Sequence, residues 1–178
     1  MKNKFYVLNL VLTLEVLRKK TGKVLVFMKP EFLKHLDAKC VLTLTGETKK
    51  AALEEIIAFA TTRCTLDDAQ LRELIWKREK MMTTGVGGGL ALPHIRVAGF
   101  PSPVIIIGLC KTPVSDYKSM DDTPIQMIVF IAADERDQEA YLKLLGSVSA
   151  SLKDRSVIGK IMENMNDPEA VLKLLGNE

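Results

Sequence analysis

The stretch REKMMTTGVGGGLALPH, residues 78–94, decides how the rest of the chain is interpreted, and it ends on one of only two histidines. A neutral imidazole is a competent nucleophile, because an ordinary pKa of about 6.5 leaves one ring nitrogen unprotonated near neutral pH. Pro93 fixes its own φ and restricts Leu92 to an extended backbone, so the apolar segment 90–92 would present His94 in a defined direction. His94 is therefore the first candidate for a catalytic residue.

The residues that precede this histidine are suited to binding an anion. Gly85 and the glycines at 87–89 allow positive φ and close approach of backbone N–H groups to a ligand. Thr83 and Thr84 add hydroxyl donors, and Arg78 adds a permanent cation whose planar fork fits phosphate or carboxylate oxygens. Plainer readings stay open: a turn entering a strand, a structural histidine, and an arginine that only complements a helix dipole.

Two common phosphate-binding motifs are excluded. No Lys-Ser or Lys-Thr pair follows the glycines, as a P-loop requires. Leu90 occupies the last glycine position of a dinucleotide fingerprint that would begin at Gly85. The glycine run therefore indicates neither of these nucleotide sites.

The same stretch resembles the signature of the type-2 IIA domains of the bacterial phosphoenolpyruvate-dependent sugar phosphotransferase system, which include fructose, mannitol and nitrogen-regulatory IIA proteins. That signature is Arg-Glu, three variable residues, Ser/Thr-Thr-Gly-Ile/Val-Gly, a small residue, Gly, an apolar triplet, Pro and His. Residues 78–94 meet it without a gap, and the resemblance extends from about Glu31 to Leu175. It implies an α/β fold in which a mixed β-sheet is sandwiched between helices in a single domain.

The resemblance also implies roles for individual residues. In the family, the histidine matching His94 carries a phosphoryl group received from the phosphocarrier protein HPr, and the arginine matching Arg78 lies against it. A second family histidine begins a helix in a His-Leu pair, where this chain has Tyr141-Leu142. The Tyr141 hydroxyl can donate a hydrogen bond to a phosphoryl oxygen but cannot carry positive charge, so we expect weaker stabilisation of the phosphorylated state.

The leading hypothesis is a phosphohistidine carrier in which His94 and Arg78 are catalytic and Thr83, Thr84 and Tyr141 bind the phosphoryl group. The group would pass to a IIB domain or serve as a regulatory mark, and the chemistry requires neither a metal nor an organic cofactor. The alternative is a non-catalytic IIA-like regulatory module that binds a transporter or kinase. Tyr141 and the unexplained N-terminal region motivate that alternative.

Composition bounds the protein class. With 47% hydrophobic and 26% charged residues, the chain is long enough for one globular domain with a sizeable core. A net charge of +3 without a long basic run argues against nucleic-acid binding. Cys40, Cys64 and Cys110 lack Cys-x-x-Cys spacing, and only His35 and His94 accompany them, which favours a reduced cytoplasmic protein without a zinc site.

Residues 1–30 lie outside the resemblance, so we divide the chain into an N-terminal extension of unknown role and a IIA-type domain at 31–178. Residues 5–17 are almost continuously apolar, but these 13 residues fall short of the ~20 that a membrane-spanning helix needs. We interpret them as a helix or strand packed on the domain or on a second copy in a homodimer. The alternatives are membrane-surface attachment and a remnant of a larger transporter chain. A short strand is expected at 23–28.

The remaining pattern predicts a mixed series of helices and strands. Two apolar runs, residues 104–110 and 126–133, are too hydrophobic for burial on one face and are expected inside the sheet. A helical turn is expected at 32–36 and a strand at 40–45. Helix starts are expected at Thr48, at Thr65 with Asp68, at Asp134 and at Asp167-Pro168.

Three further polar residues or pairs receive plain interpretations. Asp121-Asp122 is interpreted as a turn rather than as a pair of carboxylates for metal binding or acid/base work. His35 is expected at the surface without a direct role. Arg96 either steers a phosphorylated partner or is simply solvated.

Overall fold

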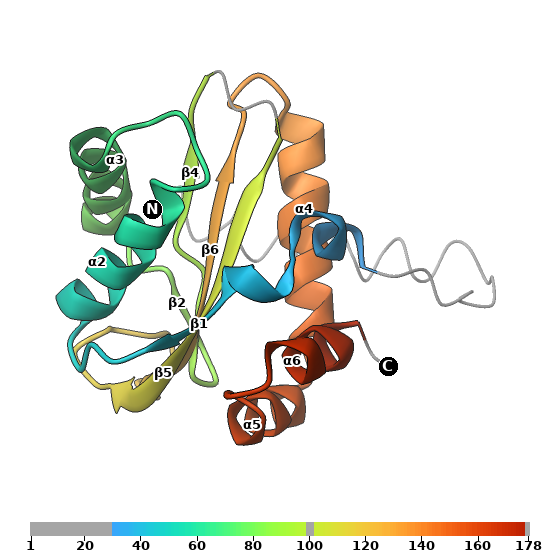
Figure 1. Ribbon diagram of the computed structural model, residues 1–178. Helices are drawn as coiled ribbons and strands as arrows, with labels where there is room; N and C mark the ends of the chain where they lie inside the picture. Colours follow the sequence, from blue (N-terminus) through green and yellow to red (C-terminus); the bar gives the residue numbers. More distant parts are fainter. Residues whose placement is uncertain (1–29, 99–101, 177–178) are drawn as a thin grey trace.

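The computed structural model describes residues 30–98 and 102–176 (Figure 1). The predictions for the N-terminal extension therefore lie outside the described residues. They comprise the apolar segment 5–17, the strand at 23–28, and the contacts proposed with a second copy or a membrane surface.

Within the described residues, six strands form one mixed sheet with the order β1-β5-β6-β3-β2, and β4 also pairs with β6. The central pair β5 and β6 is antiparallel, whereas β1 runs parallel to β5, and both β3 and β4 run parallel to β6. The strands are β1 Val41–Leu44, β2 Gly85–Gly87, β3 Leu90–Ala91, β4 His94–Arg96, β5 Val104–Val114 and β6 Ile125–Ala133. The predicted mixed α/β fold is confirmed.

The two central strands are buried on both faces, as their continuous apolar sequences predicted. Alternate residues point to opposite sides of the sheet: Ile106 and Phe130 belong to one hydrophobic cluster, and Ile105 and Val129 belong to the other. All four are 1% exposed or less. A sheet that is apolar on both faces needs helices on each side.

Helices α2 Lys49–Ala60 and α3 Asp68–Met81 cover one face of the sheet (Figure 1). Helices α4 Gln138–Ser151, α5 Arg155–Glu163 and α6 Pro168–Leu175 cover the other (Figure 1). Short 3-10 turns at Glu31–His35 and Ala38–Cys40 lead into β1. The predicted turn at 32–36 and strand at 40–45 are therefore confirmed to within a residue or two.

Two of the predicted helix caps are confirmed. The Thr48 side chain accepts a hydrogen bond from the Ala51 backbone N–H at the start of α2. At the start of α6, Asp167 accepts one from the Ala170 backbone N–H, with Pro168 in the first turn.

Two other predicted caps are wrong, and in both cases a nearby aspartate caps the helix instead. Helix α3 is capped by Asp67, which forms a capping box with Gln70, rather than by Thr65 with Asp68. Helix α4 is capped by Asp137, whereas Asp134 forms an ion pair with Arg136 at 2.6 Å. An N-cap side chain reaches only the N–H groups of the first turn. The residue at which the packed helix begins therefore determines which side chain can cap it. Helix α5, capped by Asp154, was not predicted.

Strands β3 and β4 lie one after the other along the same edge of β6, and this arrangement places His94. Leu90 is paired with Met127 and His94 with Ile131, so both strands keep the register of β6. Pro93 interrupts them because it has no N–H to donate, but its carbonyl still accepts a hydrogen bond from the Ile131 N–H at 3.0 Å. The histidine therefore begins a strand that is fixed to the centre of the sheet.

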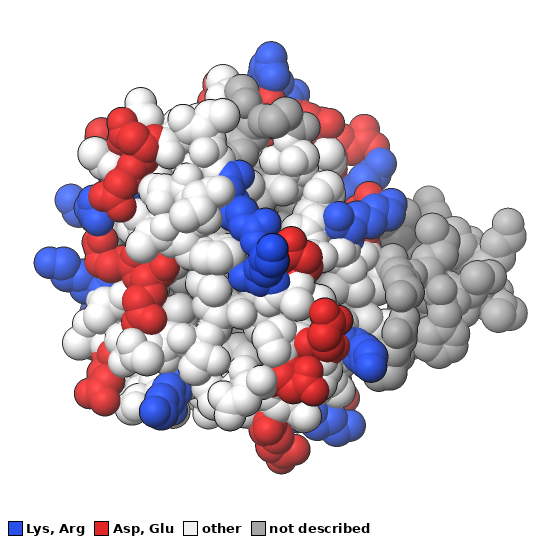
Figure 2. All heavy atoms as spheres, in the orientation of Figure 1, with Lys and Arg blue, Asp and Glu red and all other residues white. Residues whose placement is uncertain are grey.

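Acidic and basic side chains are interspersed over the face seen in Figure 2. None of the helices among the described residues has the length and apolarity that crossing a membrane requires.

Candidate functional site

Both ring nitrogens of His94 have a hydrogen-bond partner. Nδ1 lies 2.8 Å from the Leu92 carbonyl oxygen, and Nε2 lies 3.1 Å from Nε of Arg78. A carbonyl oxygen only accepts and a guanidinium only donates, so these partners assign the proton to Nδ1 and the lone pair to Nε2. The structure therefore holds a neutral imidazole whose free lone pair is on Nε2.

The surroundings favour the neutral form of His94. Burial lowers the pKa of the ring below its ordinary value, and the positive charge of Arg78 lowers it further. The Leu92 carbonyl and the charge of Glu79 act in the opposite direction but do not reverse the shift. The ring is therefore unprotonated at Nε2 near neutral pH, as a nucleophile must be.

Arg78 lies on the last turn of α3, as predicted, and its guanidinium joins that turn to the histidine. Its Nε donates to His94, and its Nη1 donates to the Met82 carbonyl oxygen at 2.8 Å. The second bond satisfies a carbonyl at the end of the helix, which is the structural role that the sequence left open. The first bond places a permanent cation on the candidate nucleophile.

Tyr141 lies in the first turn of α4, and its ring faces that of His94. The ring centroids are 6.0 Å apart, and the ring planes are inclined at 52°. Burial raises the pKa of Tyr141 to about 12 although Arg78 and Arg96 oppose the shift, so its hydroxyl stays protonated and able to donate.

Arg96 is exposed to solvent, as one of the two sequence interpretations expected, and it also contacts neighbouring groups. Its guanidinium carbon lies 5.2 Å from the centroid of the Tyr141 ring, and its Nη2 donates to the Glu135 carbonyl oxygen at 2.5 Å. These contacts place a second cation beside the tyrosine.

The two predicted threonine donors are already engaged within the protein. Thr83 donates its hydroxyl hydrogen to the Lys118 carbonyl oxygen, and Thr84 donates to the Glu79 carboxylate. Both side chains line a cavity beside His94, but Thr84 is only 3% exposed. Their contribution to phosphoryl binding stays a prediction, and it would require these hydrogen bonds to be exchanged.

The glycines form the tight turn between β2 and β3. Gly87, Gly88 and Gly89 have the predicted positive φ, at 90°, 61° and 78°. The Gly88 N–H, which was expected to approach a ligand, donates to Asp121 Oδ2 at 2.8 Å. Hydrogen bonds from backbone N–H groups lower the pKa of Asp121 to about 2. Asp121 therefore stabilises a turn, in agreement with the sequence interpretation.

Two cavities meet at Arg78 and His94. One, of about 260 Å³, is mainly apolar and is lined also by Thr83, Thr84, Val86, Leu90, Leu92, Leu145, Ser149, Leu152 and Lys153. The other, of about 390 Å³, is more open and is lined also by Leu74, Lys77, Met81, Ile95, Arg96 and Tyr141. A reacting group can therefore approach His94 beside the two arginines and the tyrosine.

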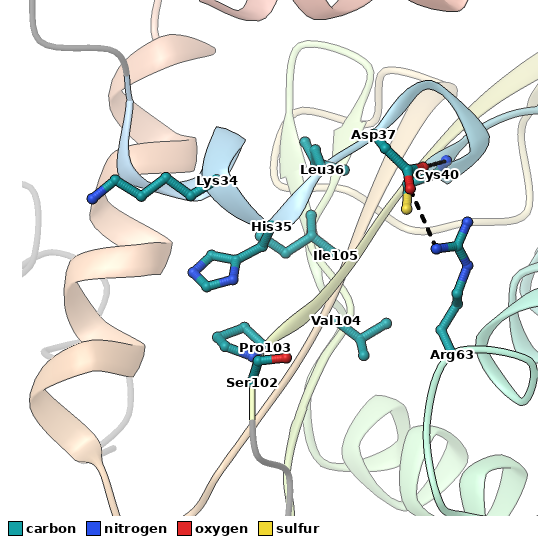
Figure 3. A pocket seen from close by; sticks show the side chains of 10 residues that line it. All are labelled: Lys34, His35, Leu36, Asp37, Cys40, Arg63, Ser102, Pro103, Val104 and Ile105. Atoms are coloured by element: carbon teal, nitrogen blue, oxygen red, sulfur yellow. Dashed lines mark hydrogen bonds and ion pairs between the residues drawn. The ribbon is translucent and has the colours of Figure 1, made fainter.

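A separate cavity of about 470 Å³ surrounds His35 and shares no residue with those at His94 (Figure 3). Its Asp37 accepts from the Cys40 backbone N–H at 3.1 Å and from Arg63 at 3.4 Å (Figure 3). Burial raises the pKa of the Cys40 thiol, which disfavours a reactive thiolate. Across residues 30–98 and 102–176, no group of three or more His, Cys, Asp or Glu could hold a metal ion. The side chains that line the cavities at His94 therefore make them the better candidates for the functional site, although these cavities are smaller than the one at His35.

Beside the site, the structure reveals a buried carboxylate for which the sequence predicted no role. Glu79 is 6% exposed, and its Oε2 lies 2.7 Å from Nζ of Lys49. Its Oε1 accepts hydrogen bonds from the hydroxyls of Thr84 and Tyr117. The only sequence signal was its place beside Arg78, because its partners are distant along the chain.

Comparisons with known proteins agree with this geometry. A sequence model of the family described as "Phosphoenolpyruvate-dependent sugar phosphotransferase system, EIIA 2" matches residues 34–178. A nitrogen regulatory protein of Pseudomonas aeruginosa is 29% identical over 138 residues, which cover 77% of this chain and 88% of the relative. The fructose-specific EIIABC component of Bacillus subtilis is 28% identical over 135 residues, or 75% of this chain and only 21% of that much longer protein.

Among solved structures, the nitrogen regulatory protein IIA-Ntr of Neisseria meningitidis has the same fold. It superimposes with a TM-score of 0.73 at 24% identity, covering 80% of this chain and 97% of that one.

Proposed function

The chain belongs to the EIIA 2 family of the phosphoenolpyruvate-dependent sugar phosphotransferase system and is a phosphotransferase component, and we propose that it carries the phosphoryl group on His94. The observation that carries this proposal is the orientation of the ring. Its Nδ1 is bound to a carbonyl, and its Nε2 lone pair faces the guanidinium of Arg78.

In the proposed step, the Nε2 lone pair attacks the phosphorus atom of a phosphohistidine on HPr. A new N–P bond forms on His94 as the N–P bond of the donor breaks, and the released electron pair returns to the donor imidazole. Positive charge develops on the His94 ring during attack. The Leu92 carbonyl at Nδ1 stabilises that charge without any proton leaving the ring.

Arg78 would exchange partners during this step. It donates to Nε2 in the free protein, and once that lone pair bonds to phosphorus, its N–H groups are released toward the phosphoryl oxygens. The Tyr141 hydroxyl is a second donor to the same oxygens, because its raised pKa keeps it protonated. Thr83 and Thr84 complete the predicted binding residues.

The proposed carrier works in the cytoplasm, taking the phosphoryl group from HPr and passing it to a IIB domain or using it as a regulatory signal. Support for the first route is the relative named as an EIIABC component, and support for the second is the relative named as a nitrogen regulatory protein.

The intact mass of the full chain, measured after incubation with phosphoenolpyruvate, enzyme I and HPr, tests the proposal. We expect a gain of one phosphate that is labile in acid and absent from His94→Ala. No gain by a folded protein, in an assay that phosphorylates an authentic IIA protein, would contradict the proposal and favour the non-catalytic regulatory module.

A further inference from the structure

We propose that Glu79 and Thr84 are positioning residues that hold His94 in its reactive tautomer, and this inference rests on the proposed function. Neither residue reaches the candidate nucleophile directly. Each acts through a neighbour that does, and the two are bound to each other in the interior of the protein.

The first route to the histidine runs through the backbone. The His94 Nδ1 proton is bound by the Leu92 carbonyl at 2.8 Å. The Leu92 N–H in turn donates to the Thr84 carbonyl oxygen at 2.9 Å. Thr84 therefore helps to fix the group that holds the proton on Nδ1, together with the pairing of the flanking residues with β6.

The second route runs through α3. Arg78 donates to Nε2 of the histidine, and Glu79 is the next residue on the same helical turn. The Glu79 carboxylate is buried, so its contacts fix the rotation and position of that turn. The two routes join where the Thr84 hydroxyl donates to Oε1 of Glu79. The result is a closed network of contacts that reaches both imidazole nitrogens. It runs through His94, Leu92, Thr84, Glu79 and Arg78.

Two further residues, Lys49 and Tyr117, contact Glu79 and Thr84 where the two routes join. Nζ of Lys49, at the start of α2, lies 2.7 Å from Oε2 of Glu79 and 4.4 Å from the centroid of the Tyr117 ring. The Tyr117 hydroxyl donates to Oε1 of Glu79 at 3.2 Å and lies 2.7 Å from the Thr84 hydroxyl. An ionised acceptor forms stronger hydrogen bonds than a neutral one, so the carboxylate fixes Thr84 more firmly than an amide would.

The closed network of contacts has a chemical consequence for His94. If Thr84 moves, the Leu92 carbonyl moves with it, and the proton is no longer held on Nδ1. The His94 imidazole can then adopt the tautomer with the proton on Nε2. That tautomer cannot attack phosphorus through Nε2. Small displacements of a reacting group are enough to slow transfer strongly.

The test compares the wild type with four variants of the full chain, each labelled with ¹⁵N. Thr84→Val removes the hydroxyl at nearly constant shape, and Thr84→Ser retains it. Tyr117→Phe is the matched control, because it removes a hydroxyl from the same buried cluster but leaves the bond between Thr84 and Glu79. Glu79→Gln tests the carboxylate without deleting the side chain. The readouts are the ¹⁵N shifts of the His94 ring, which report the tautomer, and the initial rate of phosphorylation by HPr.

We expect the wild type, Thr84→Ser and Tyr117→Phe to keep the proton on Nδ1. Thr84→Val and Glu79→Gln should show a mixture of tautomers and phosphorylation slower by about tenfold. The proposal is overturned if Thr84→Val keeps the wild-type tautomer, because a slower rate alone would reflect only the predicted phosphoryl contact of Thr84. It is also overturned if the wild-type imidazole carries its proton on Nε2. A wild type that accepts no phosphoryl group defeats the proposed function instead, and the ring spectrum still decides the positioning role.

Discussion

The two sides of the His94 ring differ in how their polar groups are used. On the inner side, Glu79, Thr84, Tyr117 and Lys49 bind one another, and the first three are at most 6% exposed. On the outer side, Lys77, Met81, Arg96 and Tyr141 line an open cavity, and Met81 is 73% exposed. The inner side therefore determines how the histidine is held, and the outer side determines what can reach it. Substitutions on the inner side should change how the histidine is held, and substitutions on the outer side should change what can reach it.

The largest effect is expected on the inner side, from Glu79→Ala. The substitution leaves the Lys49 ammonium without its partner, and losing one member of a buried ion pair costs about 3–5 kcal/mol. Chemical denaturation should show this loss in the free energy of unfolding. Glu73→Ala, at an exposed position of the same helix, is the control and should change stability by less than about 0.5 kcal/mol. If the two substitutions lowered the free energy of unfolding equally, the inner cluster would contribute no more to stability than an exposed residue does.

The next largest effect is expected where the two sides meet, from Arg78→Ala. Removing one donor that stabilises developing charge slows transfer by about a hundredfold, which corresponds to about 2.7 kcal/mol. Rapid-quench measurement of phosphorylation by HPr would determine the rate. Lys77→Ala, the neighbouring cation on the outer side, is the control and should stay within about threefold of the wild type. An unchanged rate in Arg78→Ala would remove Arg78 from the proposed step.

A third prediction concerns pH, because the pKa of His94 is lowered by burial and by Arg78. The unfolded chain binds a proton at His94 at a higher pH than the native protein does. The associated stability is therefore complete above about pH 6.5 and is lost as the pH falls through the native pKa. Titration of the His94 ring by NMR should give a midpoint below 6.5 in the wild type and a higher midpoint in Arg78→Ala. A midpoint that does not move in the variant would contradict the contribution of Arg78.

The smallest effect is expected on the outer side, from Tyr141→Phe. If the hydroxyl donates one hydrogen bond to the phosphoryl group, its loss destabilises the phosphorylated state by about 1 kcal/mol. Hydrolysis of the phosphorylated protein, followed by intact mass, should then accelerate by about fivefold. Tyr141→His restores a group that can carry charge and should slow hydrolysis relative to the wild type. Identical lifetimes in all three proteins would show that Tyr141 is only a packing residue.

Much of the fold could be predicted from local patterns in the sequence. The apolar runs of β5 and β6 and the caps at Thr48 and Asp167 depend on neighbouring residues only, and they were predicted correctly. The caps of α3 and α4 were not, because several acidic or hydroxyl residues precede each helix and the packing of the first turn selects among them. Strand β4 has three residues and is defined by its pairing with β6, which no local pattern encodes.

The candidate site divides in the same way. His94 and Arg78 were found from one continuous motif, whereas the contacts of Glu79 join residues 49, 79, 84 and 117, which only the folded chain brings together. The glycines show that a correct prediction of backbone conformation does not identify the hydrogen-bond partner. Their positive φ was predictable from residue type, but the acceptor of the Gly88 N–H is Asp121, far along the chain, and not a ligand.

The most direct test of the central claim is to determine which atom of the phosphorylated protein carries phosphorus. The full ¹⁵N-labelled chain would be phosphorylated through HPr, and the ring nitrogens of His94 observed by long-range ¹H–¹⁵N correlation. The hydrogen bonds of His94 predict phosphorus on Nε2, with the proton retained on Nδ1 opposite the Leu92 carbonyl. Phosphorus on Nδ1, or on any residue other than His94, would contradict the account.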